Sequence, residues 1–228
     1  MNRDSDLAKK AAGDAAAKLI QNDMLVGLGS GTTIVYFMKK LAEYCKAGLK
    51  VQTIASSKET ENLANSLNLP VIGVDSIVEL DISVDGADEI DPQKRMIKGG
   101  GGALLREKII AGMSRERIII VDESKCVPKL GSFPLPVEII PFAWQATIHQ
   151  LQNKNYRGKL RMISPSTPFI SDNGNYIYDI AKEALTEDIP KLNQFLLDIP
   201  GVMQTGIFIN LADKVFVGFY DGRVELRS

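Results

Sequence analysis

The first half of the chain alternates short apolar runs with amphipathic stretches. The apolar runs predict buried strands at residues 24–29, 51–55, 71–73, 80–85 and 117–121. Apolar positions at helical spacing predict helices at residues 7–20, 33–47, 57–67 and 103–113, with Ser57 and Thr60 as candidate caps of the third. Strands and helices in this order are typical of parallel βαβ units with right-handed crossovers.

The pattern changes near Gly131. The segment 133–138 is proline-rich and extended, helices are predicted at 144–153 and 189–197, and short strands at 161–162, 169–170, 176–178, 206–210 and 214–219, with a hairpin turn at 172–175. We therefore expect an α/β fold in two domains. A parallel-sheet, Rossmann-like main domain would comprise residues 1–130 and 206–228, and a smaller α+β domain would be inserted at residues 131–205.

Composition narrows the functional class. The 228 residues are 45% hydrophobic and 24% charged, which is enough to build a core, and the net charge of −1 gives no support for a nucleic-acid partner. No apolar run approaches the length of a membrane span, and the N-terminal residues do not resemble a signal peptide. Two widely separated cysteines, Cys45 and Cys126, match no disulfide or metal spacing. These features predict a cytoplasmic protein with no membrane partner.

A glycine-rich loop, residues 27–33, joins the first predicted strand to a helix. Such a loop presents backbone N–H groups at the positive end of a helix, which suits phosphate. A dinucleotide fingerprint would need a third glycine where Thr32 stands, and a Walker loop would need a lysine between its last glycine and a serine or threonine, which this loop lacks. The interpretation that remains is a small phosphate held by Ser30, Gly31, Thr32 and Thr33. The simpler alternative is a tight turn capped by a threonine.

A second cluster combines acidic residues, a lysine and glycines. Asp85, Gly86, Ala87 and Asp88 follow a predicted strand, at the sheet edge where ligands bind in open parallel sheets. Carboxylates beside an ammonium group and flexible backbone suit acid–base chemistry on a small polar substrate. On composition alone, an acidic turn, a glycine loop and a solvated helix would explain the same residues.

The second half of this cluster begins at Lys98. Lys98 precedes Gly99, Gly100 and Gly101, which could wrap around substrate oxygens, and Glu107 falls one turn into the next helix. The helical neighbours of Glu107 are apolar, so we expect it to be partly desolvated, as suits a general base.

Two other titratable residues are weaker candidates. Lys125 follows the strand at 117–121 and so lies at the same kind of strand end, although a lone lysine is usually solvated. His149 is the only histidine and lies on a helix of the inserted domain, where a structural or surface role is expected. A histidine triad or histidine metal site therefore has little support.

These motifs together resemble the type A ribose-5-phosphate isomerases over essentially the whole chain. The resemblance rests on segments 27–33, 55–57, 85–89, 98–101, 106–108, 122–125 and 133–138. It implies reversible conversion of D-ribose 5-phosphate to D-ribulose 5-phosphate in the non-oxidative pentose phosphate pathway. It implies no cofactor and no metal, and a homodimer or homotetramer.

The resemblance also implies a role for each residue. Glu107 would move a proton between C2 and C1, and Lys98 would balance the charge of the enediolate oxygens. Asp85 and Asp88 would open the ring and hold hydroxyls, and residues 30–33 with Lys125 would complete substrate binding. Two alternatives remain open: an isomerase of the same broad fold acting on an amino sugar phosphate, and a sugar-phosphate sensor without catalysis.

Overall fold

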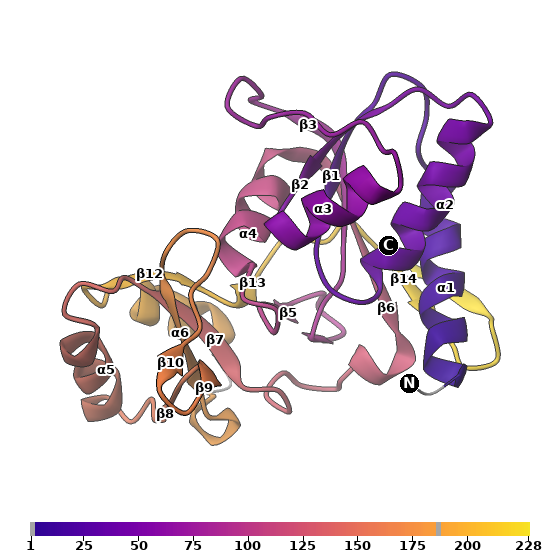
Figure 1. Ribbon diagram of the computed structural model, residues 1–228. Coiled ribbons are helices and arrows are strands. Elements are labelled where there is room, and N and C mark those ends of the chain that lie inside the picture. Colours follow the sequence, from indigo (N-terminus) through magenta and orange to yellow (C-terminus); the bar gives the residue numbers. More distant parts are fainter. Residues whose placement is uncertain (1–2, 186–187) are drawn as a thin grey trace. The chain divides into compact units, whose positions relative to one another are not determined.

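The chain folds as two units in the computed structural model, which describes residues 3–185 and 188–228 (Figure 1). Unit 1 comprises Met1–Ala87, Arg106–Cys126 and Asn210–Ser228, and unit 2 comprises Asp88–Leu105 and Val127–Ile209. No helix within the described ranges is long and apolar enough to cross a membrane.

A six-stranded sheet forms the centre of unit 1, in the order β15-β14-β6-β3-β1-β2. The strands from β14 to β2 are parallel, and only β15 at the edge is antiparallel. The strands are β1 (Leu25–Leu28), β2 (Gln52–Ala55), β3 (Leu80–Asp85), β6 (Ser114–Asp122), β14 (Lys214–Gly218) and β15 (Val224–Arg227). The predicted parallel, Rossmann-like sheet is therefore confirmed.

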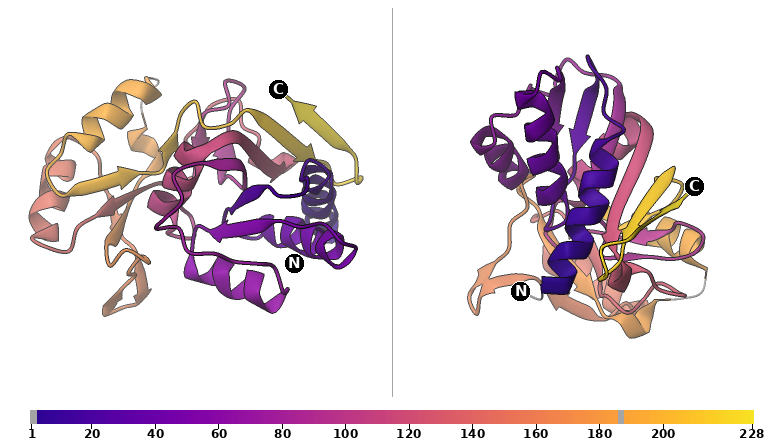
Figure 2. Two further views of the ribbon diagram at one scale, coloured as in Figure 1. Left: turned by 90° about the horizontal axis from the view of Figure 1, so that it is seen from above. Right: turned by 90° about the vertical axis from the view of Figure 1, so that its right-hand side faces the viewer.

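The helices of unit 1 cover both faces of this sheet. They are α1 (Arg3–Ala17), α2 (Ile34–Lys46), α3 (Lys58–Ser66) and α4 (Leu104–Met113), followed by the short 3-10 helix η1 (Glu123–Lys125). Helices α1 and α2 pack side by side, as two further views show (Figure 2). On the opposite face, Ile110 of α4 packs with Ile54 and Leu80. Ser57 caps α3 by accepting a hydrogen bond from the Thr60 N–H, as expected.

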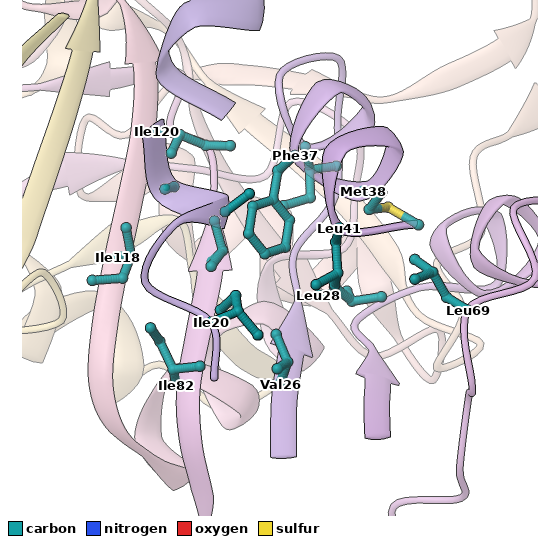
Figure 3. Close-up of a cluster of buried hydrophobic side chains, with 14 of the residues drawn as sticks. Ile20, Val26, Leu28, Phe37, Met38, Leu41, Leu69, Ile82, Ile118 and Ile120 are labelled. Atoms are coloured by element: carbon teal, nitrogen blue, oxygen red, sulfur yellow. The ribbon is translucent and has the colours of Figure 1, made fainter. Parts of the chain in front are cut away.

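Alternate strand residues and the apolar stripe of α2 build the main core. Phe37 is fully buried among side chains that include Leu28, Ile118 and Ile120 (Figure 3). Burying each such side chain contributes roughly 1.5–3 kcal/mol. This core fixes α2 against the sheet, and with it the loop that precedes α2.

The strand order places a topological switch point between β1 and β3. From β1 the chain passes through α2 to β2 on one side, and then crosses to β3 on the other side of β1. In open parallel sheets, ligands bind at such a point, outside the carboxyl ends of the strands. The segments that begin at Gly29 and Gly86 leave the sheet at this place.

Unit 2 is built on antiparallel pairs. A four-stranded sheet has the order β12-β7-β11-β8, and a three-stranded sheet the order β13-β5-β4. The strands are β4 (Glu89–Ile90), β5 (Met96–Ile97), β7 (Leu135–Ile139), β8 (Gly158–Leu160), β9 (Met162–Ser164), β10 (Thr167–Pro168), β11 (Tyr176–Ile180), β12 (Val202–Thr205) and β13 (Ile207–Phe208). Helices α5 (Trp144–Asn153) and α6 (Ile189–Leu197) have the predicted bounds and share the core of the larger sheet; η2 (Lys182–Ala184) is a short 3-10 helix.

The observed units differ from the predicted domains mainly at one long segment, and also at the short stretches 127–130 and 206–209, which belong to unit 2. Asp88–Leu105 belongs to unit 2, whereas the sequence placed it in the main domain. The cause is strand pairing over long range: β5 pairs with β13, and the Lys98 N–H donates to the Gly206 carbonyl at 2.9 Å. Sequence periodicity carries no signal for such short strands.

Several strand predictions also need correction. Residues 71–73 form no strand, since only Val71 bridges to Thr53 and the preceding Pro70 lacks an N–H donor. The strand expected at 161–162 spans the break between β8 and β9, and that at 169–170 follows β10. Strands β4, β5, β12 and β15 were not expected. The turn at 172–175 is present, closed by the Ser171 N–H donating to the Asn175 carbonyl at 2.8 Å.

Candidate active site

The loop between β1 and α2 holds the four residues predicted to bind phosphate. Gly31 and Thr32 are exposed and Thr33 is buried. Gly31 has φ +94°, which favours glycine. Thr33 occupies the N-cap position of α2, but its side chain makes no capping hydrogen bond. A threonine-capped turn is therefore not what this loop provides, and the amino end of α2 suits an anion.

Asp85 ends β3 and is fixed by the neighbouring backbone. Its Oδ1 accepts hydrogen bonds from the N–H groups of Gly86, at 2.7 Å, and Ser30, at 3.1 Å. A Cβ at Gly29 would lie 2.0 Å from this same oxygen. Glycine at position 29 is thus required for the Asp85 carboxylate to approach the loop. The hydrogen bond from the Ser30 N–H then joins the segment after β1 to the end of β3.

Glu107 lies in the first turn of α4 and is only 5% exposed. Glu107 is thus buried, as expected, and is not a solvated surface glutamate. The Ser30 hydroxyl donates a hydrogen bond to Glu107 Oε1. Ser30 was predicted as a phosphate ligand, and its side chain also contacts the candidate base. A hydroxyl donor helps to orient the carboxylate and leaves its negative charge in place.

The residue after Glu107 has unusual electrostatics. Lys108 is half-buried, and the loss of water around its ammonium group lowers its pKa to about 7. Its charge therefore changes near neutral pH, next in sequence to the candidate base.

Lys125 occupies η1, directly after the carboxyl end of β6. The turn is formed by Asp122, whose Oδ1 accepts hydrogen bonds from the N–H of Ser124, at 3.0 Å, and from its hydroxyl. Lys125 is half-buried. Because β3 and β6 are parallel neighbours, Asp85 at the end of β3 and Lys125 just after β6 lie at the same edge of the sheet.

Unit 2 carries the remaining predicted residues. Lys98 follows β5 and is only 4% exposed, and its ammonium nitrogen lies 5.4 Å from the centre of the Phe208 ring. This cation–π contact holds the Lys98 ammonium group against the ring of Phe208, a residue of β13. The Asp88 N–H donates to the Ile97 carbonyl at 2.9 Å, which places the aspartate beside the end of β5.

The glycine turn after Lys98 is tied to Asp88. The Gly100 N–H donates to Asp88 Oδ2 at 2.8 Å, and a Cβ at Gly100 would lie 2.7 Å from the other carboxylate oxygen. A larger residue at position 100 would push the carboxylate away. Gly101 is exposed, with open space beside it.

The predicted residues thus form two sets. Unit 1 brings together Ser30, Asp85, Gly86 and Glu107, with Lys125 at the same sheet edge; unit 2 brings together Asp88, Lys98 and the glycine turn. Sequence reasoning missed Gly29, although it stands within the quoted glycine motif, and Phe208, for which no local signal existed. His149 is exposed on α5 beside Asn153, as expected for a residue without a role in the site. Among the described residues, no three His, Cys, Asp or Glu side chains gather to hold a metal ion.

Comparison with known proteins gives one consistent result. The family model for ribose 5-phosphate isomerase A (phosphoriboisomerase A) matches residues 52–222. Ribose-5-phosphate isomerase A of Protochlamydia amoebophila is 46% identical over 96% of this chain and 94% of its own. The Bacillus mycoides protein of the same name is 45% identical over 95% of this chain and 98% of its own.

Solved structures of two relatives match this chain over essentially its full length. A D-ribose-5-phosphate isomerase in complex with phospho-erythronic acid has a TM-score of 0.93 and 39% identity, covering 100% of both chains. Ribose 5-phosphate isomerase A from Methanocaldococcus jannaschii has a TM-score of 0.89 and 36% identity, covering 98% of both chains. The motifs, the fold and these relatives lead to one conclusion: the chain belongs to the ribose 5-phosphate isomerase A family.

Proposed function

We propose that this enzyme interconverts D-ribose 5-phosphate and D-ribulose 5-phosphate through an enediolate, with Glu107 as the base. The observation that carries the mechanism is the buried Glu107 carboxylate, oriented by the Ser30 hydroxyl, in unit 1 of an isomerase-family chain. Abstraction of a proton beside a carbonyl needs such a base. In the aldose-to-ketose direction, Glu107 takes the proton from C2 and returns it to C1.

The charge that develops on the two substrate oxygens needs a cation. Lys98 is assigned this role because its ammonium group is nearly excluded from water, where an electrostatic interaction is stronger than at the surface. Its contact with Phe208 keeps it in place without neutralising it. Asp85 and Asp88 are assigned to ring opening and to the hydroxyls, since both are carboxylates held by backbone N–H donors.

The phosphate is assigned to the loop before α2. Gly31, Thr32 and Thr33 offer backbone N–H groups and the positive helix end, and Lys125 adds a cation at the same sheet edge. Gly86, Ala87, Gly99 and Gly101 complete the binding surface assigned to the sugar. The relative solved with phospho-erythronic acid supports a phosphate-bearing ligand, although it does not by itself assign these residues.

We also propose that no cofactor or metal takes part. Lys98 provides the positive charge that a metal ion would otherwise supply. Exhaustive treatment with a chelator is expected to leave kcat unchanged. Loss of activity that returns on adding a divalent ion would contradict this proposal.

We also propose a cellular compartment and an oligomeric state for the enzyme. Both cysteines are free thiols, in keeping with a reducing cytoplasm. Unit 2 exposes large apolar side chains at Phe142, Ile163 and Ile170, which suit burial in a homodimer or homotetramer. Sedimentation analysis of the purified protein would give the subunit number, and a monomer at micromolar concentration would contradict the oligomer.

The reaction run in heavy water tests the mechanism. Proton transfer through Glu107 allows exchange with solvent, so product should carry deuterium at C1 in at least part of the molecules. A direct hydride shift would retain the substrate hydrogen completely. Mass spectrometry of the product, stopped early in the reaction, distinguishes the two outcomes.

A further inference from the structure

Four consecutive glycines, residues 99–102, follow Lys98, the proposed cation of the site. Gly99 and Gly102 have φ values of +103° and +83°, and the Gly102 N–H closes the turn by donating to the Gly99 carbonyl at 2.9 Å. Glycine loses more conformational freedom on ordering than any other residue. A turn of this composition needs anchors outside itself if it is to present a fixed set of donors to a substrate.

Arg161 supplies the anchor. Its Nη1 donates to the carbonyl oxygens of Gly99, at 2.9 Å, and Gly100, at 3.0 Å. The other edge of the guanidinium makes a bidentate pair with Asp179 through Nε, at 2.9 Å, and Nη2. Arg161 therefore binds Asp179 of β11 with one edge of its guanidinium and the glycine turn with the other. Lysine cannot reproduce this planar fork of donors.

Phe169 packs against both Arg161 and the glycine turn. The guanidinium carbon of Arg161 lies 5.7 Å from the centre of the Phe169 ring. The ring also rests against Gly102, where a Cβ would lie 2.4 Å from a ring carbon. The backbone of Arg161 is fixed too, since its N–H donates to the Ile177 carbonyl at 2.8 Å.

The Arg161 bonds set the direction of two peptide groups. Each peptide is trans and planar, so its N–H points opposite to its carbonyl. The Gly99–Gly100 peptide has its carbonyl on Arg161 and its N–H on Asp88. The Gly100–Gly101 peptide has its carbonyl on Arg161, so the Gly101 N–H points away from the guanidinium, in the exposed part of the turn.

We propose that Arg161 is a positioning residue of the isomerase, acting through the glycine turn on Asp88 and on the Gly101 N–H. Arg161, one peptide group and Asp88 form a continuous chain of hydrogen bonds, in which each bond polarises the next. This inference rests on the proposed function, which assigns Asp88 and the turn to the substrate. Arg161 itself is not assigned any contact with substrate.

The test compares Arg161→Met and Arg161→Lys with wild type, using ribose 5-phosphate. Arg161→Met should lower kcat/KM about 10- to 100-fold, since displacing a site by about 1 Å can cost that much. Arg161→Lys should recover only part of the loss, because it keeps the charge and loses the fork. Arg117→Met is the matched control: Arg117 makes a bidentate pair with Asp213 in unit 1, at 2.7 and 2.8 Å, and its loss should leave kcat/KM unchanged.

A double-mutant cycle with Asp88→Asn separates positioning from a general loss of structure. If Arg161 acts through Asp88, the two effects on kcat should be clearly less than multiplicative, whereas Arg117→Met with Asp88→Asn should multiply. If Arg161→Met does not fold, Asp179→Asn takes its place in the cycle. Kinetics within twofold of wild type for Arg161→Met, or a fully multiplicative cycle, would overturn the proposal. Normal kinetics for Asp88→Asn alone would instead refute the assignment of Asp88 in the proposed function.

Discussion

The two units hold their candidate residues by different means. In unit 1, Ser30, Asp85 and Lys125 all lie at the carboxyl ends of parallel strands, where the fold alone places them at one edge of the sheet. In unit 2, Lys98 follows a strand of only two residues, and the glycine turn depends on Arg161, 62 positions away in the sequence. The first set is positioned by topology and the second by specific side-chain contacts.

This difference predicts where substitutions act. A change in unit 1 that spares the sheet should affect the function of the altered group alone, since the scaffold is set by the core around Phe37. A change in unit 2 should spread through the contacts that hold Lys98 and the glycine turn. The substitutions below test that contrast, from the largest expected effect to the smallest.

Glu107→Gln should have the largest effect. The amide keeps the shape and can still accept the Ser30 hydrogen bond, but it cannot take a proton, so kcat should fall about 10²- to 10⁴-fold. Folding should survive, because a neutral amide is less costly to bury than a carboxylate. Glu59→Gln, in the exposed first turn of α3, is the control. Near-normal turnover of Glu107→Gln would remove it as the base.

Lys98→Met should come next and should act on kcat more than on KM. Its charge faces negative charge that develops only after proton removal, so its loss should cost on the order of 10²-fold in kcat, like the loss of an oxyanion donor. Lys39→Met is the control, since Lys39 also lies over a ring, 5.8 Å from the centre of Tyr36. Unchanged kcat with a raised KM would make Lys98 a binding residue only.

The same contrast explains how much could be predicted from the sequence. Helices α5 and α6 and the strand ending at Asp85 were predicted because their periodicity is local, and the glycine loop was predicted because its motif is contiguous. The assignment of Asp88–Leu105 to unit 2 could not be predicted, since it depends on pairing with β13 more than a hundred residues later. The Ser30–Glu107 bond and the Arg161 anchor likewise join residues that no local pattern relates.

Thr32→Glu should have a moderate effect, confined to binding. Thr32 is exposed, so a glutamate there folds without a burial cost and places a negative charge against the phosphate. KM should rise about tenfold or more while kcat changes little, and the rise should shrink at high salt. Thr32→Gln, similar in size and uncharged, should stay near wild type. Equal effects of the two variants would point to bulk and not to charge.

Ser30→Ala should have the smallest effect and decides which role its side chain has. The hydroxyl donates to Glu107, while the Ser30 N–H, which alanine retains, donates to Asp85. A hydrogen bond to a charged group is worth about 1.5–3 kcal/mol, but Glu107 would stay buried in the same helix turn, so only part of this should be lost. We expect kcat to fall about tenfold with KM little changed, and Ser30→Thr, which keeps a hydroxyl, to recover most of it. A raised KM at normal kcat would instead return the Ser30 hydroxyl to the phosphate, as its sequence motif first indicated, and would leave Glu107 oriented by burial alone.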